Sequence, residues 1–273
     1  MTTQADRATE PDPRLPTRRQ RQRQATYAEI VAAARTLLRG PAPLSLRAVA
    51  HEMGMTAPAL YRYVDGYDEL VALVSDAIFD DVVAHLLAAR DSVDVEDPAG
   101  QLVVSAVAFR TWALAHREEF GLVFASRDNA DAEHAHEPKA GGFSFSEFFC
   151  DLYLRVQARY GLSVPSDLDL PPQFLAAVQA LPPACGAVAP PATSTMTPGL
   201  VWVFTRAWSR LYGMVTLEVF GHLEPDLVRS GEMFAAMIED NARDLGLEAE
   251  WSRLSVMVGE RMGAPSHDTG SLR

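Results

Sequence analysis

The chain has 273 residues, of which 48% are hydrophobic, so it is long enough to bury a substantial core in one large domain or in two smaller ones. Two cysteines are too few for a disulfide framework or a cysteine-rich zinc site, and no apolar stretch reaches the roughly eighteen residues that a membrane span needs. The first residues also lack the apolar run of a secretion signal. We therefore expect a cytoplasmic protein with no membrane partner and with reduced thiols. A single disulfide bridge is the alternative for the two cysteines.

The net charge of −12 is unevenly distributed along the chain. Residues 14–64 contain nine arginines and two acidic residues, Glu29 and Glu52, which gives +7 for this segment and leaves −19 for the rest. Because phosphate contacts need Lys or Arg, a small basic module on a large acidic body can bind DNA through one face. A solvated basic tail is the alternative for residues 14–24.

Residues 1–25 are polar and proline-containing, which predicts a disordered leader ending in a basic arm. Order is expected from Thr26, where a first helix of about fourteen residues is indicated by apolar residues at helical spacing and ended by Gly40 and Pro41. Those apolar residues are Ile30, Val31, Ala34, Leu37 and Leu38.

Two short helices follow within residues 45–64. Ser45 is the expected N-cap of the first, and Gly54 stands where a helix commonly ends through a left-handed residue. Thr56 is the expected N-cap of the second, a helix of about seven residues with Pro58 in its first turn. Leu60 and Val64 supply its buried stripe.

Three short helices, the last two joined by a tight turn, predict a helix-turn-helix whose final helix enters the DNA major groove. Small residues at Ala57 and Ala59 allow close approach to base edges, and an arginine such as Arg62 can donate two hydrogen bonds to guanine. The hydroxyls of Thr56 and Tyr61 suit phosphate contacts. The alternative is a plain three-helix bundle with no DNA contact.

This segment resembles the N-terminal pattern of the TetR family of regulators. The resemblance rests on Leu44-Ser45-Leu46-Arg47-Ala48-Val49-Ala50, Gly54-Met55-Thr56-Ala57-Pro58-Ala59-Leu60-Tyr61-Arg62-Tyr63-Val64 and Asp68-Glu69-Leu70. It implies that Arg47, Ala57, Pro58, Tyr61 and Tyr63 lie at or near DNA, with Arg47 and Arg62 as candidates for base contacts.

One position departs from the family pattern. Tyr67 stands where the family usually has a lysine, so a phosphate contact there would be weaker or made by a hydroxyl. An arginine arm reaching the minor groove could compensate. The complete set of predicted DNA-contacting residues is Arg18, Arg19, Arg21, Arg23, Ser45, Arg47, Thr56, Ala57, Pro58, Ala59, Tyr61, Arg62, Tyr63 and Tyr67.

The rest of the chain predicts helices and no strand. A connector helix is expected at about 70–90, and further helices at about 100–125, 142–161, 171–181, 198–222, 226–246 and 250–262, with loops at 127–142 and 182–198. The resulting fold class is all-α, with a DNA-binding domain at 26–70, a helical ligand-binding and dimerisation body at 71–262, and a disordered tail at 263–273.

The body also resembles a TetR subgroup that carries a Trp-x-x-x-His-Gly signature. The similarity rests on the segment from Phe109 to Phe120 and on Arg206 to Gly213, where Tyr212 replaces the histidine. A pocket for a mostly apolar ligand would explain the aromatic residues of these segments, although core packing explains them equally well. The candidate ligand-binding residues are Phe109, Trp112, Phe124, Phe145, Phe149, Trp202, Trp208 and Tyr212.

The two segments 198–222 and 226–246 carry apolar residues on more than one face and need two surfaces to bury them. A symmetric partner could supply the second surface, which gives Val215, Val219, Phe234, Met237 and Ile238 as dimer-interface candidates. Burial inside one subunit is the alternative.

No phosphate-binding glycine loop, nucleophile elbow or zinc-ligand spacing is present, so an enzyme, a cofactor and a metal are not expected. Cys150 is interpreted as a small buried hydrophobe rather than a redox sensor. A DNA-architectural protein would lack a sensory body. The predicted function is a ligand-responsive regulator, a repressor released from its operator by a small, mostly apolar molecule. Its predicted partners are double-stranded operator DNA, an unidentified effector and a second copy of the chain.

Overall fold

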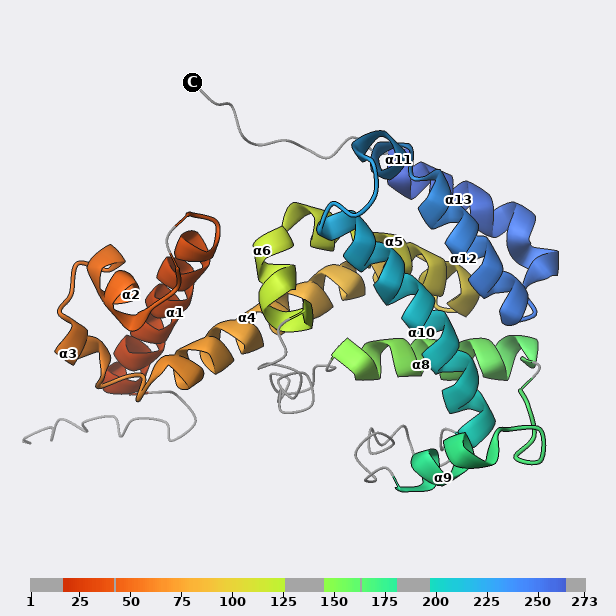
Figure 1. Ribbon diagram of the computed structural model, residues 1–273, viewed down its shortest axis with the longest axis horizontal. Coiled ribbons are helices and arrows are strands. Elements are labelled where there is room, and N and C mark those ends of the chain that lie inside the picture. The colour runs from red at the N-terminus through yellow and green to blue at the C-terminus, as the bar shows by residue number, and fades with distance from the viewer. Residues whose placement is uncertain (1–16, 42, 126–144, 163, 181–196, 264–273) are drawn as a thin grey trace, which may run out of the picture. The chain divides into compact units, whose positions relative to one another are not determined.

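The computed structural model describes residues 17–41, 43–125, 145–162, 164–180 and 197–263. Two compact units divide the chain, Met1–Ala77 and Ile78–Arg273. Every regular element in the described ranges is a helix, which confirms the all-α fold (Figure 1). The expected leader before residue 17, the tail after residue 263, most of the two expected loops and Cys185 lie outside these ranges.

The first unit contains α1 (Arg18–Leu38), α2 (Leu46–Glu52), α3 (Ala57–Leu60) and the beginning of α4 (Tyr67–Asp91). Its core is formed by apolar side chains that all these helices contribute: Ile30, Ala34, Val49, Ala50, Leu60, Val64, Leu70 and Val74. The unit boundary falls inside α4, which therefore contributes to both units. The sequence-based domain limits at residues 70 and 71 stay predictions.

Helix α1 begins at Arg18, eight residues before the expected start at Thr26. A capping box starts it, because Thr17 Oγ1 accepts a hydrogen bond from the Gln20 backbone N at 3.3 Å and Gln20 Oε1 accepts one from Thr17 N at 2.7 Å. All residues from Thr17 to Ala25 are exposed. The added turns have no buried stripe, so their helix depends on the cap and on the high helix propensity of arginine and glutamine, which periodicity does not detect.

The second unit is built around α5 (Pro98–Ala115), which is buried along nearly its whole length. Helices α8 (Phe145–Tyr160), α10 (Pro198–Val219) and α13 (Trp251–Gly263) pack against it. Helices α9 (Pro172–Ala180) and α12 (Glu232–Asp244) pack against α10, as Figure 1 also shows. A helix surrounded on all sides explains why α5 has apolar residues on every face.

Two helices expected to be continuous are interrupted. The expected helix at 226–246 is α11 (Pro225–Ser230) followed by α12, because Gly231 between them adopts a left-handed φ of 70°. Within the expected helix at 100–125, α5 ends at its C-cap His116. It is followed by α6 (Arg117–Phe120) and a π-helical turn, Gly121–Ala125. Another short turn, η4 (Glu248–Glu250), precedes α13.

None of the helices within the described ranges is long and apolar enough to cross a membrane.

Candidate functional site

The turn between α2 and α3 has the geometry expected of a helix-turn-helix. Ser45 Oγ accepts a hydrogen bond from Ala48 N at 3.2 Å and caps α2, and Gly54 ends this helix with φ 66°. Met55 N then donates to Ala50 O at 2.9 Å. Thr56 occupies the N-cap position of α3 without a side-chain capping bond, so its hydroxyl is available for other partners.

The polar residues that the sequence indicated lie directly before and after α3. Leu60 and Val64 are completely buried, whereas Thr56, Pro58, Tyr61 and Arg62 are exposed. Ala57, Ala59 and Tyr63 are half-buried beside them, as is Ser45 at the start of α2, and Arg47 and Tyr67 are exposed. The helix is only four residues long, and the backbone continues as a turn through Tyr63.

The four arginines of the predicted arm lie on the first turns of α1, and all are exposed. Arg23 Nη2 donates to the Tyr27 hydroxyl at 3.0 Å, and the guanidinium lies 5.5 Å from the centre of the same ring. The Tyr27 hydroxyl donates in turn to the Tyr63 carbonyl at 3.2 Å. Sequence patterns did not indicate this connection, because it joins residues 36 positions apart through a single hydroxyl.

Seven of the eight candidate ligand-binding residues form one aromatic cluster in the second unit. Phe109 is its centre, with ring centroids 5.5 Å from Phe124, 5.2 Å from Phe145 and 5.8 Å from Trp208. Trp112, Phe149 and Tyr212 contact its other members, and Phe120 also belongs to it. Phe79 of α4 extends the cluster through a 5.5 Å contact with Phe124.

Tyr212 joins two parts of this cluster. Its ring centroid lies 5.7 Å from that of Trp208, and its hydroxyl donates a hydrogen bond to the Phe124 carbonyl in the π-helical turn. Trp208 and Tyr212 therefore connect α10 to that turn. π-Helical turns occur frequently at functional sites.

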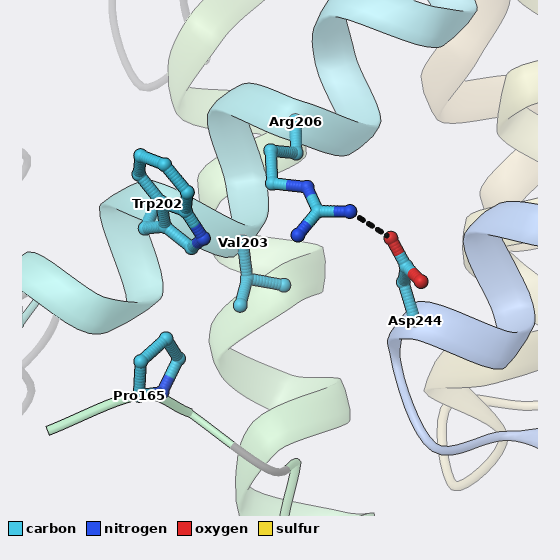
Figure 2. A pocket seen from close by; sticks show the side chains of 5 residues that line it. All are labelled: Pro165, Trp202, Val203, Arg206 and Asp244. Carbon is cyan, nitrogen blue, oxygen red and sulfur yellow. Dashed lines mark hydrogen bonds and ion pairs between the residues drawn. The ribbon is translucent and has the colours of Figure 1, made fainter. Parts of the chain in front are cut away.

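Trp202 lies apart from the cluster and packs on Phe174 of α9, with centroids 4.8 Å apart. It lines a pocket of about 260 Å³ with Pro165, Val203, Arg206 and Asp244, shown in Figure 2. Arg206 Nη2 and Asp244 Oδ2 form an exposed ion pair of 3.1 Å across this pocket. The position of Trp202 on a charged surface separates it from the apolar cluster.

A second, smaller cavity of about 30 Å³ lies between α5, α8, α10 and α12. Phe149 and Trp208 of the predicted set line it, together with Tyr153, Phe204 and Asn241. Burial raises the pKa of the Tyr153 hydroxyl well above its ordinary value, so this group stays protonated. Sequence reasoning did not select Tyr153, Phe204 or Asn241, which share no motif.

The dimer-interface candidates are all buried within one chain. Val215 and Phe234 are 0% exposed, and Val219, Met237 and Ile238 do not exceed 6%. These side chains belong to the core of the second unit and offer no surface to a partner, so the alternative of burial inside one subunit describes them. The second face of each helix is polar or only scattered with exposed apolar residues.

The sequence patterns also did not predict a buried ion pair. Arg110 of α5 and Glu218 of α10 are 8% and 1% exposed, and Arg110 Nε lies 2.6 Å from Glu218 Oε2. Arg110 Nη2 donates to the Val228 carbonyl at 2.6 Å, and the guanidinium lies over the Phe234 ring. The pair joins α5, α10, α11 and α12. Among the described residues, no group of three or more His, Cys, Asp or Glu side chains could hold a metal ion.

Comparisons with known proteins agree with this arrangement. A family model described as the tetracyclin repressor-like C-terminal domain matches residues 102–241. The HTH-type transcriptional regulators Mb1846 of Mycobacterium bovis and Rv1816 of Mycobacterium tuberculosis are each 34% identical over 87 residues, 32% of this chain and 37% of theirs. The chain thus matches about 37% of the length of these curated relatives.

Two solved structures resemble most of the chain. The regulatory protein SCO4313 is 25% identical, with a TM-score of 0.56 over 82% of this chain and 98% of that one. RolR, solved in complex with its ligand resorcinol, is 16% identical, with a TM-score of 0.53 over 86% of this chain and 95% of that one, and this match concerns the fold alone. No enzymatic family is indicated by these matches.

Proposed function

The chain belongs to the TetR family of transcriptional regulators, and from that premise we propose that it is a repressor that a small, mostly apolar effector releases from its operator. The observation that carries this proposal is the exposed surface around α3, where the exposed residues Thr56, Tyr61 and Arg62 stand at the two ends of a helix held by the buried side chains of Leu60 and Val64. Such a helix can enter the major groove of double-stranded DNA.

The DNA-binding surface extends from α3 to the N-terminal turns of α1. Arg47 and Arg62 are the candidates for base contacts, and Arg18, Arg19, Arg21 and Arg23 supply phosphate or minor-groove contacts from a helix rather than from an extended arm. The hydroxyl of Tyr67, which is 50% exposed, would replace the family's lysine as a phosphate contact.

Binding of the purified chain to its own promoter DNA tests this surface. We expect Arg47→Ala and Tyr61→Phe each to weaken DNA binding by roughly tenfold, because each variant loses about one hydrogen bond to DNA, made by a charged group in Arg47 and by a neutral hydroxyl in Tyr61. Arg229→Ala removes an exposed arginine of the second unit and serves as the control. Unchanged binding by both the Arg47→Ala and the Tyr61→Phe variant would refute the proposed surface.

The ligand response is proposed to act through the aromatic cluster. An effector that enters beside Trp208 must move that ring, and Tyr212 and Phe124 connect Trp208 to Phe79 of α4. An effector shifts the protein only if it binds the released conformation more tightly than the DNA-bound one. Tyr212→Phe removes the hydrogen bond to Phe124 O, so we expect it to bind DNA normally and to need a higher effector concentration for release.

A homodimer is proposed because a pair of recognition helices about one DNA turn apart reads a two-fold operator. With the earlier candidates buried, the proposed interface lies on the outer faces of α10 and α12, where Leu217 and Met233 are 42% and 48% exposed. We expect Leu217→Glu to sediment as a monomer at micromolar concentration. Leu168→Glu, at a residue that is 97% exposed outside these helices, is the matched control.

A further inference from the structure

Asn241 is one of the residues with a polar group that line the small cavity between α5, α8, α10 and α12, beside Tyr153 and Trp208. It is only 8% exposed and stands among apolar side chains such as Leu102, Leu211 and Ile238. Its Nδ2 donates to the Ala207 carbonyl at 3.2 Å and contacts Met237 Sδ at 3.3 Å. Its Oδ1 is buried and has no hydrogen-bond partner among the described residues.

The orientation of the Asn241 amide follows from its neighbours. Exchanging Oδ1 and Nδ2 would place a carbonyl oxygen against the Ala207 carbonyl, so the contact with Ala207 requires the amino group there. The group left over is therefore an acceptor. Burying an acceptor without a donor is unfavourable, and such groups in native proteins commonly have a function or a further partner.

The lining of the cavity restricts the chemistry of a partner. Of the described residues that line it, none carries a charge, and most are aromatic or aliphatic. An ionised ligand group would lose its hydration here without a counter-charge. A neutral molecule with an apolar body and one hydrogen-bond donor would pack against the apolar walls and donate a hydrogen bond to Asn241 Oδ1.

On the premise of the ligand response proposed above, we propose that this cavity takes the polar end of the effector, and that Asn241 Oδ1 accepts a hydrogen bond from its hydroxyl or N–H group. Asn241 is thus the residue that sets effector specificity. The effector class is a small, uncharged aromatic or cyclic molecule bearing one donor, and acids of the same size are rejected.

The cavity of about 30 Å³ has room for little more than a water molecule, so such a ligand must displace a wall. Trp208 and Phe204 are the half-buried members of the lining and are the side chains that can turn outward. Trp208 contacts Phe109, Phe145 and Tyr212 of the aromatic cluster. Filling the cavity would therefore repack the cluster.

Isothermal titration calorimetry of the full chain without DNA tests the specificity with phenol, toluene, anisole and benzoate. Phenol and toluene match in size and differ in the donor, and anisole keeps the oxygen but has no hydrogen to donate. We expect phenol to bind about tenfold more tightly than toluene or anisole, and benzoate to bind more weakly than phenol. Equal affinities of phenol and toluene, tight binding of anisole or benzoate, or no binding of phenol would overturn the proposal.

Asn241→Leu removes the acceptor, together with the amino group bonded to Ala207 O, and keeps the number of side-chain heavy atoms; it should reduce the phenol-to-toluene preference to about one while toluene still binds. A purely structural asparagine would not affect this ratio. Thr216→Val is the matched control, because Thr216 Oγ1 is another buried oxygen without a partner among the described residues but does not line the cavity. If Asn241→Leu does not fold, the comparison of phenol with anisole on the unmodified chain still tests whether the cavity prefers a hydrogen-bond donor.

Release of promoter DNA is measured separately on the same samples. Donor-selective binding without DNA release would support the cavity assignment and contradict the proposed ligand response. DNA release by an effector that binds equally well to the Asn241→Leu variant would support the response and overturn the role of Asn241.

Discussion

At the scale of single residues, the second unit contains a pair of oppositely charged side chains in its buried core. Arg110 and Glu218 are withdrawn from water, and each would be unpaired without the other. Removing two charges from water costs several kcal/mol, which a close contact and further hydrogen bonds offset only in good geometry. The Val228 carbonyl supplies one such bond, so the pair fixes α5, α10 and α11 relative to one another.

We predict that Arg110→Met lowers the free energy of unfolding of the second unit by about 3 to 5 kcal/mol, because Glu218 is left as a buried, uncompensated charge. The double variant Arg110→Met with Glu218→Leu should recover most of this stability. All four tryptophans lie in the second unit, so urea denaturation followed by tryptophan fluorescence reports on it.

Arg229→Ala is the control for this prediction. The exposed pair of Arg229 with Asp226 should contribute no more than about 1 kcal/mol. A destabilisation by Arg110→Met as small as that of the control would contradict this prediction.

At the scale of the elements, the short helices of the first unit depend on their caps. Isolated helices of this length are unstable in water, and their stability comes from packing and from satisfied backbone groups at their ends. Ser45 caps α2, whereas Thr56 occupies the equivalent position of α3 without a capping bond. The two hydroxyls therefore have separable roles.

We predict that Ser45→Ala destabilises the first unit by about 1 kcal/mol, because it removes the cap of α2. Thr56→Ala should leave stability nearly unchanged and weaken DNA binding instead, since its hydroxyl is exposed. Amide hydrogen exchange of residues 46–60 measures the first effect, and fluorescence anisotropy with labelled promoter DNA measures the second. A destabilisation by Thr56→Ala equal to that of Ser45→Ala would contradict this separation.

The break between α11 and α12 depends on one glycine. Gly231 has φ 70°, and a Cβ there would lie 3.1 Å from Met262 Sδ. We predict that Gly231→Ala destabilises the second unit by about 1 to 2 kcal/mol, from left-handed backbone strain and contact with Met262. Gly259→Ala, in the middle of α13 with open space around it, should stabilise by about 0.5 to 1 kcal/mol. Thermal unfolding by tryptophan fluorescence measures both, and destabilisation by both variants would contradict the prediction.

At the scale of the whole molecule, the basic and acidic residues are segregated between the two units. Exposed arginines lie at the start of α1, on α2 and just after α3 in the first unit, while the large second unit carries most of the acidic residues. Phosphate neutralisation releases counterions, so the affinity for DNA should fall steeply with salt. Repulsion between the acidic body and DNA limits non-specific contact.

We predict that the double variant Arg19→Ala and Arg23→Ala makes the slope of log K against log salt shallower by about two, one for each phosphate group that is no longer neutralised. Arg253→Ala is the control, because Arg253 is paired with Asp97 and Glu250 in the second unit. Titrations between about 50 and 200 mM salt measure the slope. An unchanged slope would show that the N-terminal turns of α1 are not part of the DNA-binding surface.

Local patterns in the sequence determined much of the first unit. The Ser45 cap, the left-handed Gly54 and the buried Leu60 and Val64 were predicted correctly, because each depends on a few neighbouring residues. The all-α fold and the family were also predicted, since helical periodicity and the order of the motif residues are properties of the sequence. The role of the predicted DNA contacts stays a prediction.

Tertiary structure alone decided which apolar and polar residues meet. Helical spacing placed Val215 and Phe234 on apolar faces, but only the packing of α10, α12 and their neighbours showed that these faces are interior. The same packing separated Trp202 from the aromatic cluster and brought Asn241 beside Trp208. The physical reason is that burial and hydrogen-bond satisfaction depend on contacts between residues distant in sequence, and one chain's periodicity does not specify those partners.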